Sequence, residues 1–454
     1  MTQPTQPPAP ALSIHPLKSG LPQGKPLTTK ALIRLVSTSE SPNQNAPRPP
    51  LDLAIVIDRS GSMSGGSLTA ALGSAKNLIR GLHSTDRVAV VVFNQNVQVV
   101  QALAQLADRE SLIQRLDGIR ADGNTALFAG WEEGAKQLAP FTSPQRTSRV
   151  ILLTDGQANQ GLTDENEISV KVRELAKAGV TTSTVGLGQG FNETLLAKIS
   201  DAGEGQAHFG QRPEDLEEGF AEEFLILSTA HLRQVELRVS GGNGVVAKLL
   251  RRDGTREATT RLGTLAFGTS LDAIVELDIG AERQAGGLIS VTATGKDASG
   301  AEITLGPVVL SLPELDAAAW AALTPDASVA NAIAESDFAD EFLRIHKLAE
   351  EGNVREALAA LRELRQRPGA TAWAERTAKY IVGLADDDLG SAIKELSYSS
   401  RAFRTRSKSI NVSEAYSPTH NASLDLSAPA HLSKKIGMGR NRKRAITEND
   451  EETK

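Results

Sequence analysis

The chain has 454 residues, of which 49 are lysine or arginine and 55 are aspartate or glutamate, and its formal net charge is −6. This length predicts two or three domains with room for a sizeable core, and so mild a charge gives no global field for binding nucleic acid. The chain has no cysteine, which excludes disulfide frameworks, zinc–thiolate sites and thiol nucleophiles.

The N-terminal region predicts neither a leader nor a membrane anchor. Its first residues, MTQPTQPPAPALSIHP, lack the charged start and the apolar core of a signal peptide. No apolar run approaches the roughly 20 residues that span a bilayer. We therefore expect a cytoplasmic protein. Residues 1–28 are rich in proline, glutamine and threonine, which predicts a disordered arm.

Residues 29–50 contain one predicted strand, ALIRLV at 31–36, followed by a second proline-rich stretch. The prolines separate this strand from the apolar runs that follow, so it is not expected in the central sheet. We expect it to pair with a β domain later in the chain.

Residues 51–229 alternate between the apolar patterns of strands and helices. The predicted strands are 53–57, 87–93, 97–103 (an edge strand), 150–153, 180–185 and 206–209. The predicted helices are 67–82, 111–119, 126–138, 164–178, 193–199 and 214–227. This alternation predicts an α/β fold with a doubly wound parallel sheet, in which ligands bind beyond the carboxyl ends of the strands.

Oxygen-bearing side chains follow three of these apolar segments. In LDLAIVIDRSGSMS (51–64), a buried strand ends at Asp58, and Ser60 and Ser62 follow. Thr125 lies in the turn of ADGNTALFAG, and Asp155 ends the strand of RVILLTDGQAN. Such hard donors suit Mg²⁺ or Ca²⁺. Taken alone, the first segment is equally compatible with Asp58 and the serines capping the next helix.

Together these segments resemble the von Willebrand factor type A (vWA) domain, and they match its metal-ion-dependent adhesion site (MIDAS) in order and spacing. The resemblance covers about residues 51–228. It implies that Mg²⁺ (or Ca²⁺ or Mn²⁺) is held by Asp58, Ser60, Ser62, Thr125 and Asp155. It also implies that a glutamate or aspartate of a partner protein completes the coordination. The implied function is non-enzymatic, metal-dependent protein binding in a scaffold of bacterial type.

Three further regions follow the predicted vWA domain. Residues 230–313 contain short strands separated by Gly-Gly, Asn-Gly and Asp-Gly turns, which predicts a β-sandwich. Residues 314–400 show helical apolar stripes, with a hairpin at EEGNVREA. Residues 401–454 are polar and charge-segregated, which predicts a disordered tail.

Several alternatives remain open from the sequence. A regulatory subunit of an AAA+ ATPase or chelatase assembly would keep the same metal site. A metal-dependent hydrolase would use Asp58 and Asp155, although no nucleophile or base is recognisable beside them. Nucleic-acid binding would fall on the basic segment 434–444, and is not expected. The glycines at 186, 188 and 190 depart from the spacing of a dinucleotide-binding loop.

Overall fold

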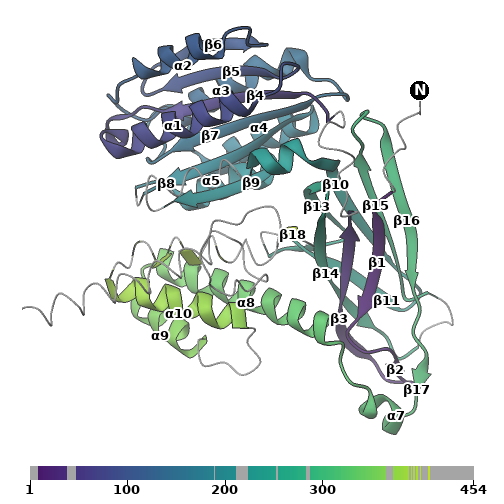
Figure 1. Cartoon of the computed structure of the whole chain (residues 1–454). Helices are drawn as coiled ribbons and strands as arrows, with labels where there is room; N and C mark the ends of the chain where they lie inside the picture. Colours follow the sequence, from purple (N-terminus) through teal and green to yellow (C-terminus); the bar gives the residue numbers. More distant parts are fainter. Residues whose placement is uncertain are drawn as a thin grey trace, which may run out of the picture.

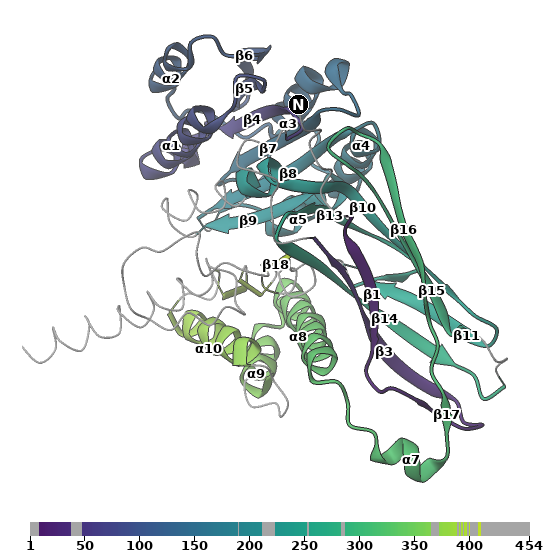
Figure 2. The same cartoon turned by 45° about the vertical axis from the view of Figure 1, so that its right-hand side comes forward.

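The computed structural model describes residues 9–37, 48–188, 190–210, 223–251, 254–282, 287–364, 372–387, 390, 392–393, 395–396, 399 and 407–409. Three parts are visible in Figures 1 and 2: a layered α/β part, a region of long antiparallel strands, and a group of helices beside these strands. None of the helices within these ranges is long and apolar enough to cross a membrane.

The α/β part is built on a six-stranded sheet in the order β6-β5-β4-β7-β8-β9. Its strands are β4 (Leu51–Asp58), β5 (Arg87–Phe93), β6 (Val97–Ala104), β7 (Thr147–Thr154), β8 (Val180–Leu187) and β9 (Glu204–Gly210). The edge strand β6 is antiparallel to β5, and the other pairs are parallel. The sheet is therefore mixed, with a parallel core and the predicted edge strand.

Helices cover both faces of this sheet. The helices are α1 (Gly66–Gly81), α2 (Arg109–Asp117), α3 (Leu127–Leu138), α4 (Glu165–Lys177) and α5 (Glu193–Ala202). Helices α1 and α2 share one apolar core with the sheet, and α3, α4 and α5 share the other. All eight residues of β4 are buried as a result, which explains its continuous apolar run. Of the predicted helix at 214–227, only residues 223–227 lie within the described part, and they are helical.

The second part consists of two antiparallel sheets. One has the order β1-β3-β14-β11-β12 and the other β13-β10-β15-β16. These strands are β1 (Ala11–Pro16), β3 (Leu27–Val36), β10 (Ala230–Gly241), β11 (Val245–Leu250), β12 (Arg256–Glu257), β13 (Thr259–Ala266), β14 (Thr269–Ile279), β15 (Ile289–Lys296) and β16 (Glu302–Leu310). Side chains of both sheets meet in one apolar core, for example Ile33 with Val291.

The N-terminal strands belong to this second part. Strand β3 pairs with β14 along its whole length, which confirms the predicted pairing of residues 31–36 with a later β domain. Figure 1 shows the purple strands β1 and β3 among the green ones. The α/β part is therefore inserted between β3 and β10, rather than preceding a separate β domain.

The prediction of a disordered arm over residues 1–28 is wrong for its second half. Residues 11–16 form β1, which pairs with β3, and the short strand β2 (Leu21–Pro22) pairs with β17 (Glu314–Leu315). Leu12 and Ile14 alternate with polar residues, as expected for a strand with one face on a core, and they pack against the core of the two sheets. The prediction gave weight to the proline-rich composition and overlooked this alternation. Residues 1–8 lie outside the described part of the chain.

The third part is helical, as expected for residues 314–400. Its helices are α7 (Ala317–Ala322), α8 (Ala327–Glu350), α9 (Val354–Leu364) and α10 (Ala372–Asp387). The predicted hairpin corresponds to α8 and α9, which share an apolar core with α10. The start of α8 packs on the first β-sheet, where Val329 contacts the cluster around Leu32 and Ile274.

The predicted disordered tail lies outside the described residues, apart from β18 (Ser407–Ser409). This short strand pairs with β14, so the prediction of disorder is wrong at these three residues. Its pairing partner β14 is far away in the sequence, so the local composition of the tail could not reveal this pairing.

Candidate metal site

The predicted metal ligands come from three loops at one end of the α/β sheet. Asp58 ends β4, Asp155 directly follows β7, and Thr125 lies just before α3. From β4 the chain builds the sheet outward through β5 and β6, and then returns to build the other half from β7. The order of the strands therefore reverses between β4 and β7, which is where ligands bind in sheets of this kind.

Hydrogen bonds connect four of the five side chains. Asp58 Oδ1 accepts a hydrogen bond from the Ser60 N–H at 2.7 Å. The Oγ atoms of Ser60 and Ser62 are hydrogen bonded at 3.1 Å, and the Ser62 hydroxyl donates to Asp155 Oδ1 at 2.7 Å. Ser62 and Asp155 are 93 positions apart in the sequence. The structure thus brings distant residues together into one continuous group of oxygen atoms.

Thr125, the fifth side chain, reaches the same place. A Cβ built on Gly156 would lie 3.2 Å from Thr125 Oγ1 and 3.5 Å from Ser62 Oγ, so both hydroxyls face the same glycine. Four of the five residues are buried, with exposed fractions of 0% for Asp58, 1% for Ser60, 3% for Thr125 and 8% for Asp155. Ser62 is exposed, so the group opens to solvent on its side.

The two carboxylates have no basic partner among the residues that the structure describes. Burial raises the pKa of the Asp58 carboxyl, and hydrogen bonds from Thr154 and Ser60 only partly oppose it. Burial also raises the pKa of Asp155, against a hydrogen bond from Ser62 and with added repulsion from Asp58. Within the described ranges, neither carboxylate forms an ion pair with a lysine, arginine or histidine. Negative charge is therefore concentrated here without a compensating cationic side chain in the described structure.

The donor set fits a hard divalent cation. The described residues contain no group of three or more histidine, cysteine, aspartate or glutamate side chains, so a site built on such ligands is not found there. Two carboxylates and three hydroxyls offer up to five oxygen donors, which suits Mg²⁺ or Ca²⁺. A cation would also offset the repulsion between the two aspartates.

Four residues that the sequence analysis missed hold the loops in place. The Thr154 hydroxyl donates to Asp58 Oδ2, and the Asn94 amide donates to the Asp122 carbonyl at 2.9 Å. The backbone N–H of Asn124 donates to Gln95 Oε1 at 2.8 Å, and that of Thr125 to Asn159 Oδ1 at 2.9 Å. The sequence could have indicated Asn94 and Gln95, because these polar residues directly follow the predicted strand at 87–93, at the end of the sheet where ligands bind.

Glycine permits one of these loops to approach the others. Gly123 has a φ of +77°, a conformation that glycine adopts without strain. The Gln95 side chain fills the space that a Cβ at position 123 would need, with Oε1 only 1.6 Å from the Cβ position. A larger residue would therefore displace Gln95 and loosen the loop that carries Thr125.

The structure contradicts the capping alternative for the serines of the first loop. The N-cap of α1 is Gly65, and no side chain caps this helix, so the serines at 60 and 62 do not cap α1. The Ser60 hydroxyl does not cap the short 3₁₀ turn after it either. By contrast, Asp164 caps α4, since it accepts a hydrogen bond from the Glu167 N–H at 2.8 Å.

The glycines near position 188 have a packing role. A Cβ on Gly186 would lie 2.5 Å from the ring of Phe191, and one on Gly190 would lie 2.8 Å from the Asp155 carbonyl oxygen. Both glycines are therefore required by close neighbours. This packing accounts for them without a bound dinucleotide.

Comparison with known proteins places this domain in a family. The model of the von Willebrand factor type A domain matches residues 52–222. An uncharacterized protein of Synechocystis sp. is 27% identical over 227 residues, which are 50% of this chain and 52% of that protein. The uncharacterized protein YfbK of Escherichia coli is 30% identical over 159 residues, which are 35% of this chain and 28% of YfbK. The chain thus spans about half of one relative and less than a third of the other.

Two solved structures share the fold over nearly the whole chain. A von Willebrand factor type A protein from Catenulispora acidiphila has a TM-score of 0.67 at 18% identity, covering 88% of this chain and 98% of that one. The ArnB paralog VWA2 from Sulfolobus acidocaldarius has a TM-score of 0.60 at 17% identity, covering 88% and 99%. At such low identity the likeness concerns the fold alone.

Proposed function

Because residues 52–222 form a vWA domain, a fold commonly used for protein–protein interaction, we propose that this domain binds a protein partner through a divalent cation. The cation, Mg²⁺ or alternatively Ca²⁺ or Mn²⁺, would be held by Asp58, Ser60, Ser62, Thr125 and Asp155. One observation carries the proposal: two neighbouring buried aspartates lie beside three hydroxyls and have no basic partner in the described part of the chain.

The ligand count leaves room for the partner. Mg²⁺ prefers six oxygen donors in octahedral geometry, and this chain supplies at most five. Only two of these donors are charged, so they would at most neutralise a divalent cation, and its coordination could still accept one more anionic oxygen. A glutamate or aspartate of the partner would suit the remaining position, because the group of oxygen donors is exposed to solvent at Ser62.

Arg59 supports an acidic partner. Its guanidinium makes one long contact in the described structure, 3.5 Å from Nη2 to Asn94 Oδ1. It forms no ion pair with a described carboxylate. A second acidic side chain of the partner would find a charge-assisted hydrogen bond there.

The proposed role is non-enzymatic, and a cytoplasmic scaffold of bacterial type stays a prediction from the sequence. Catalysis would need a nucleophile or a general base beside the two aspartates. Only hydroxyl and backbone groups are hydrogen bonded to them in the described structure. Turnover of phosphate esters that survives Ser60→Ala and Ser62→Ala would contradict this role.

Partner capture tests the proposal. The full chain would be immobilised in Mg²⁺, exposed to extract and washed with EDTA. We expect partners to be retained in Mg²⁺, released by EDTA and absent from Asp58→Ala. Ser64→Ala is the matched control, because Ser64 is exposed on the same loop but lies outside the five ligands. Retention that ignores both EDTA and Asp58→Ala would reject the proposal.

A further inference from the structure

A cavity of about 180 Å³ lies between the vWA domain and the antiparallel strands. The vWA domain contributes Thr147, at the start of β7, and Thr181, near the start of β8, so the cavity is at the opposite end of the sheet from the metal site. The strands contribute Arg233, Gln234 and Lys296, among others. This location makes it a second, separate site at the junction of two parts of the molecule.

The backbone is distorted on both sides of the cavity. Glu204 and Gln234 have φ values of 57° and 53°, and they are the two non-glycine residues with positive φ in the described ranges. Both line the cavity. The β10 pairings shift register around Gln234, and the β8–β9 pairing shifts just after Glu204. Bulges and strained backbone of this kind concentrate at functional sites.

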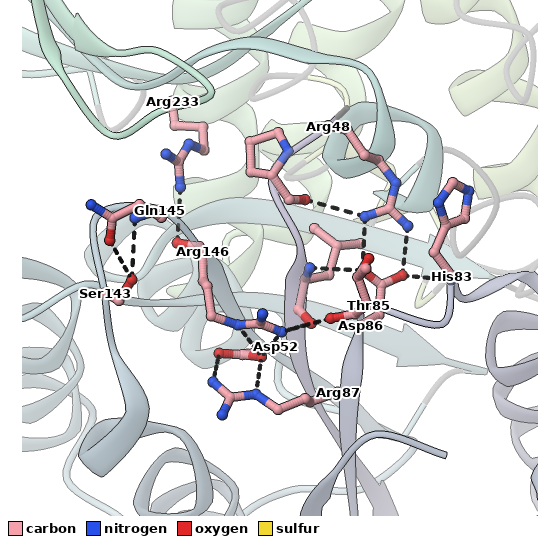
Figure 3. Close-up of polar contacts among 12 residues, drawn as sticks. Arg48, Asp52, His83, Thr85, Asp86, Arg87, Ser143, Gln145, Arg146 and Arg233 are labelled. Carbon is pink, nitrogen blue, oxygen red and sulfur yellow. Dashed lines mark hydrogen bonds and ion pairs between the residues drawn. The ribbon is translucent and has the colours of Figure 1, made fainter. Parts of the chain in front are cut away.

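The bulge in β10 directs Arg233 into the junction. Its guanidinium donates to the carbonyls of Pro144 and Arg146 at 2.7 and 2.9 Å, and to the Asp297 carbonyl at 2.8 Å. Figure 3 shows Arg233 reaching from above toward the carbonyl of Arg146. Arg233 is only 7% exposed, and its hydrogen bonds all go to neutral oxygens, including Thr147 Oγ1. Its charge is thus buried without a contacting carboxylate.

The other two arginines of the cavity wall each contact a carboxylate. Arg149 pairs with Glu223 at 3.0 Å. Arg146 pairs with the fully buried Asp52 at 2.7 Å, and Figure 3 shows Arg87 on the same carboxylate. Because Asp52 is shared by two arginines, it balances only one of their two positive charges.

Two lysines add to the charge of Arg233. Lys177 and Lys296 line the cavity, and neither forms an ion pair with a described residue. The one acidic residue of the lining, Glu204, is already paired with Arg261. Three cationic side chains from two parts of the molecule thus line one cavity without a contacting carboxylate from the described residues.

We propose that this cavity binds a small oxyanion carrying two or more negative charges, which bridges the vWA domain to the antiparallel strands. A cavity of about 150 Å³ can hold a benzene-sized molecule, so the observed volume suits pyrophosphate or a small tricarboxylate rather than a whole nucleotide. Lys177 would bind it from the vWA domain and Lys296 from β15, while Arg233 supplies positive charge between them. Bridging would fix the orientation of the two parts.

Calorimetric titration of the full chain tests the site. The probes are inorganic phosphate, pyrophosphate and citrate, each at an ionic strength matched with potassium chloride. We expect saturable binding of pyrophosphate, citrate or both, and a rise in the melting temperature of the protein with bound ligand. The relative affinities for pyrophosphate and citrate would distinguish a phosphate ligand from a carboxylate ligand. Absence of saturable binding for all three probes at millimolar concentration would overturn the proposal.

Two lysine variants assign the binding to this cavity. Lys177→Ala and Lys296→Ala should each weaken binding by about tenfold, the loss expected for one charge-assisted hydrogen bond. The matched control is Lys171→Ala, which removes an exposed lysine from the same helix, α4, but outside the cavity; it should change affinity less than about twofold. If all three variants bound the ligand as tightly as the native protein does, the binding site would lie elsewhere and the proposal would be contradicted. Circular dichroism would verify that each variant is folded.

Discussion

Replacing Glu223 with glutamine should strongly destabilise the vWA domain. Glu223 lies on the helix that closes the domain, and its carboxylate contacts Arg149 Nη1 at 3.0 Å, the Ser183 hydroxyl at 2.7 Å and His208 Nε2 at 3.3 Å. Although complete burial opposes ionisation, the charge of Arg149 and the hydrogen bonds of His208 and Ser183 lower the pKa of Glu223 from 4.5 to about 2. The carboxylate is therefore ionised and compensated in the folded protein.

The pKa shift gives the size of the effect. A lowering from 4.5 to about 2 corresponds to about 3 kcal/mol of stability at neutral pH, at 1.36 kcal/mol per unit. Glu223→Gln removes this and leaves Arg149 buried without its countercharge, so we expect a loss of about 3–5 kcal/mol in the free energy of unfolding. Because the folded-state pKa is lowered, the contribution is complete above about pH 4.5 and disappears as the pH falls toward 2.

Urea unfolding monitored by tryptophan fluorescence measures this loss. Trp131 is buried in the vWA domain, and Trp320→Phe with Trp373→Phe would leave it as the sole reporter. The control is Glu132→Gln, which breaks an exposed pair with Lys136 and should cost less than about 0.5 kcal/mol. The reasoning would be refuted if the Glu223→Gln protein were as stable as this control at pH 7. It would also be refuted if the loss of unfolding free energy relative to the native protein stayed undiminished toward pH 3.

Four further substitutions, at three positions, test packing, the metal site and backbone strain. Gly134→Ala should lower the free energy of unfolding by about 1–3 kcal/mol, because its Cβ would lie 2.3 Å from Val56 Cγ2; a more stable variant in urea would contradict this. Gly156→Ala should weaken Mg²⁺ binding by about tenfold in calorimetry while the fold survives, since its Cβ would lie 3.2 Å from Thr125 Oγ1; unchanged affinity would oppose it. At the left-handed position 234, Gln234→Val should cost about 1–3 kcal/mol and Gln234→Gly less than about 1, and equal melting curves would speak against strain there.

Local sequence patterns placed Asp58 and Asp155 at strand ends, because apolar runs lead up to both of them. The resemblance to the vWA domain, rather than periodicity, supplied the full set of five proposed ligands. In a parallel sheet, the carboxyl ends of neighbouring strands lie at one edge, which brings the side chains together. Their role as metal ligands remains a prediction.

Long-range pairing could not be predicted in the same way. Residues 11–16 pair with β3, and β3 pairs with β14 more than 200 residues later, which no window of local sequence contains. The cavity and the bonds of Arg233 depend on how two parts of the chain dock. In the sequence, Arg233 was only one polar residue within a predicted strand.

Calorimetric titration of the purified full chain with Mg²⁺ tests the central claim most directly. We expect one Mg²⁺ per chain for the native protein, no binding by Asp58→Asn, and weakened binding by Thr125→Ala, while Ser64→Ala binds as the native protein does. Native protein that takes up no Mg²⁺, Ca²⁺ or Mn²⁺ at millimolar concentration would contradict the account. Binding that is equally strong after Asp58→Asn and Thr125→Ala would do the same.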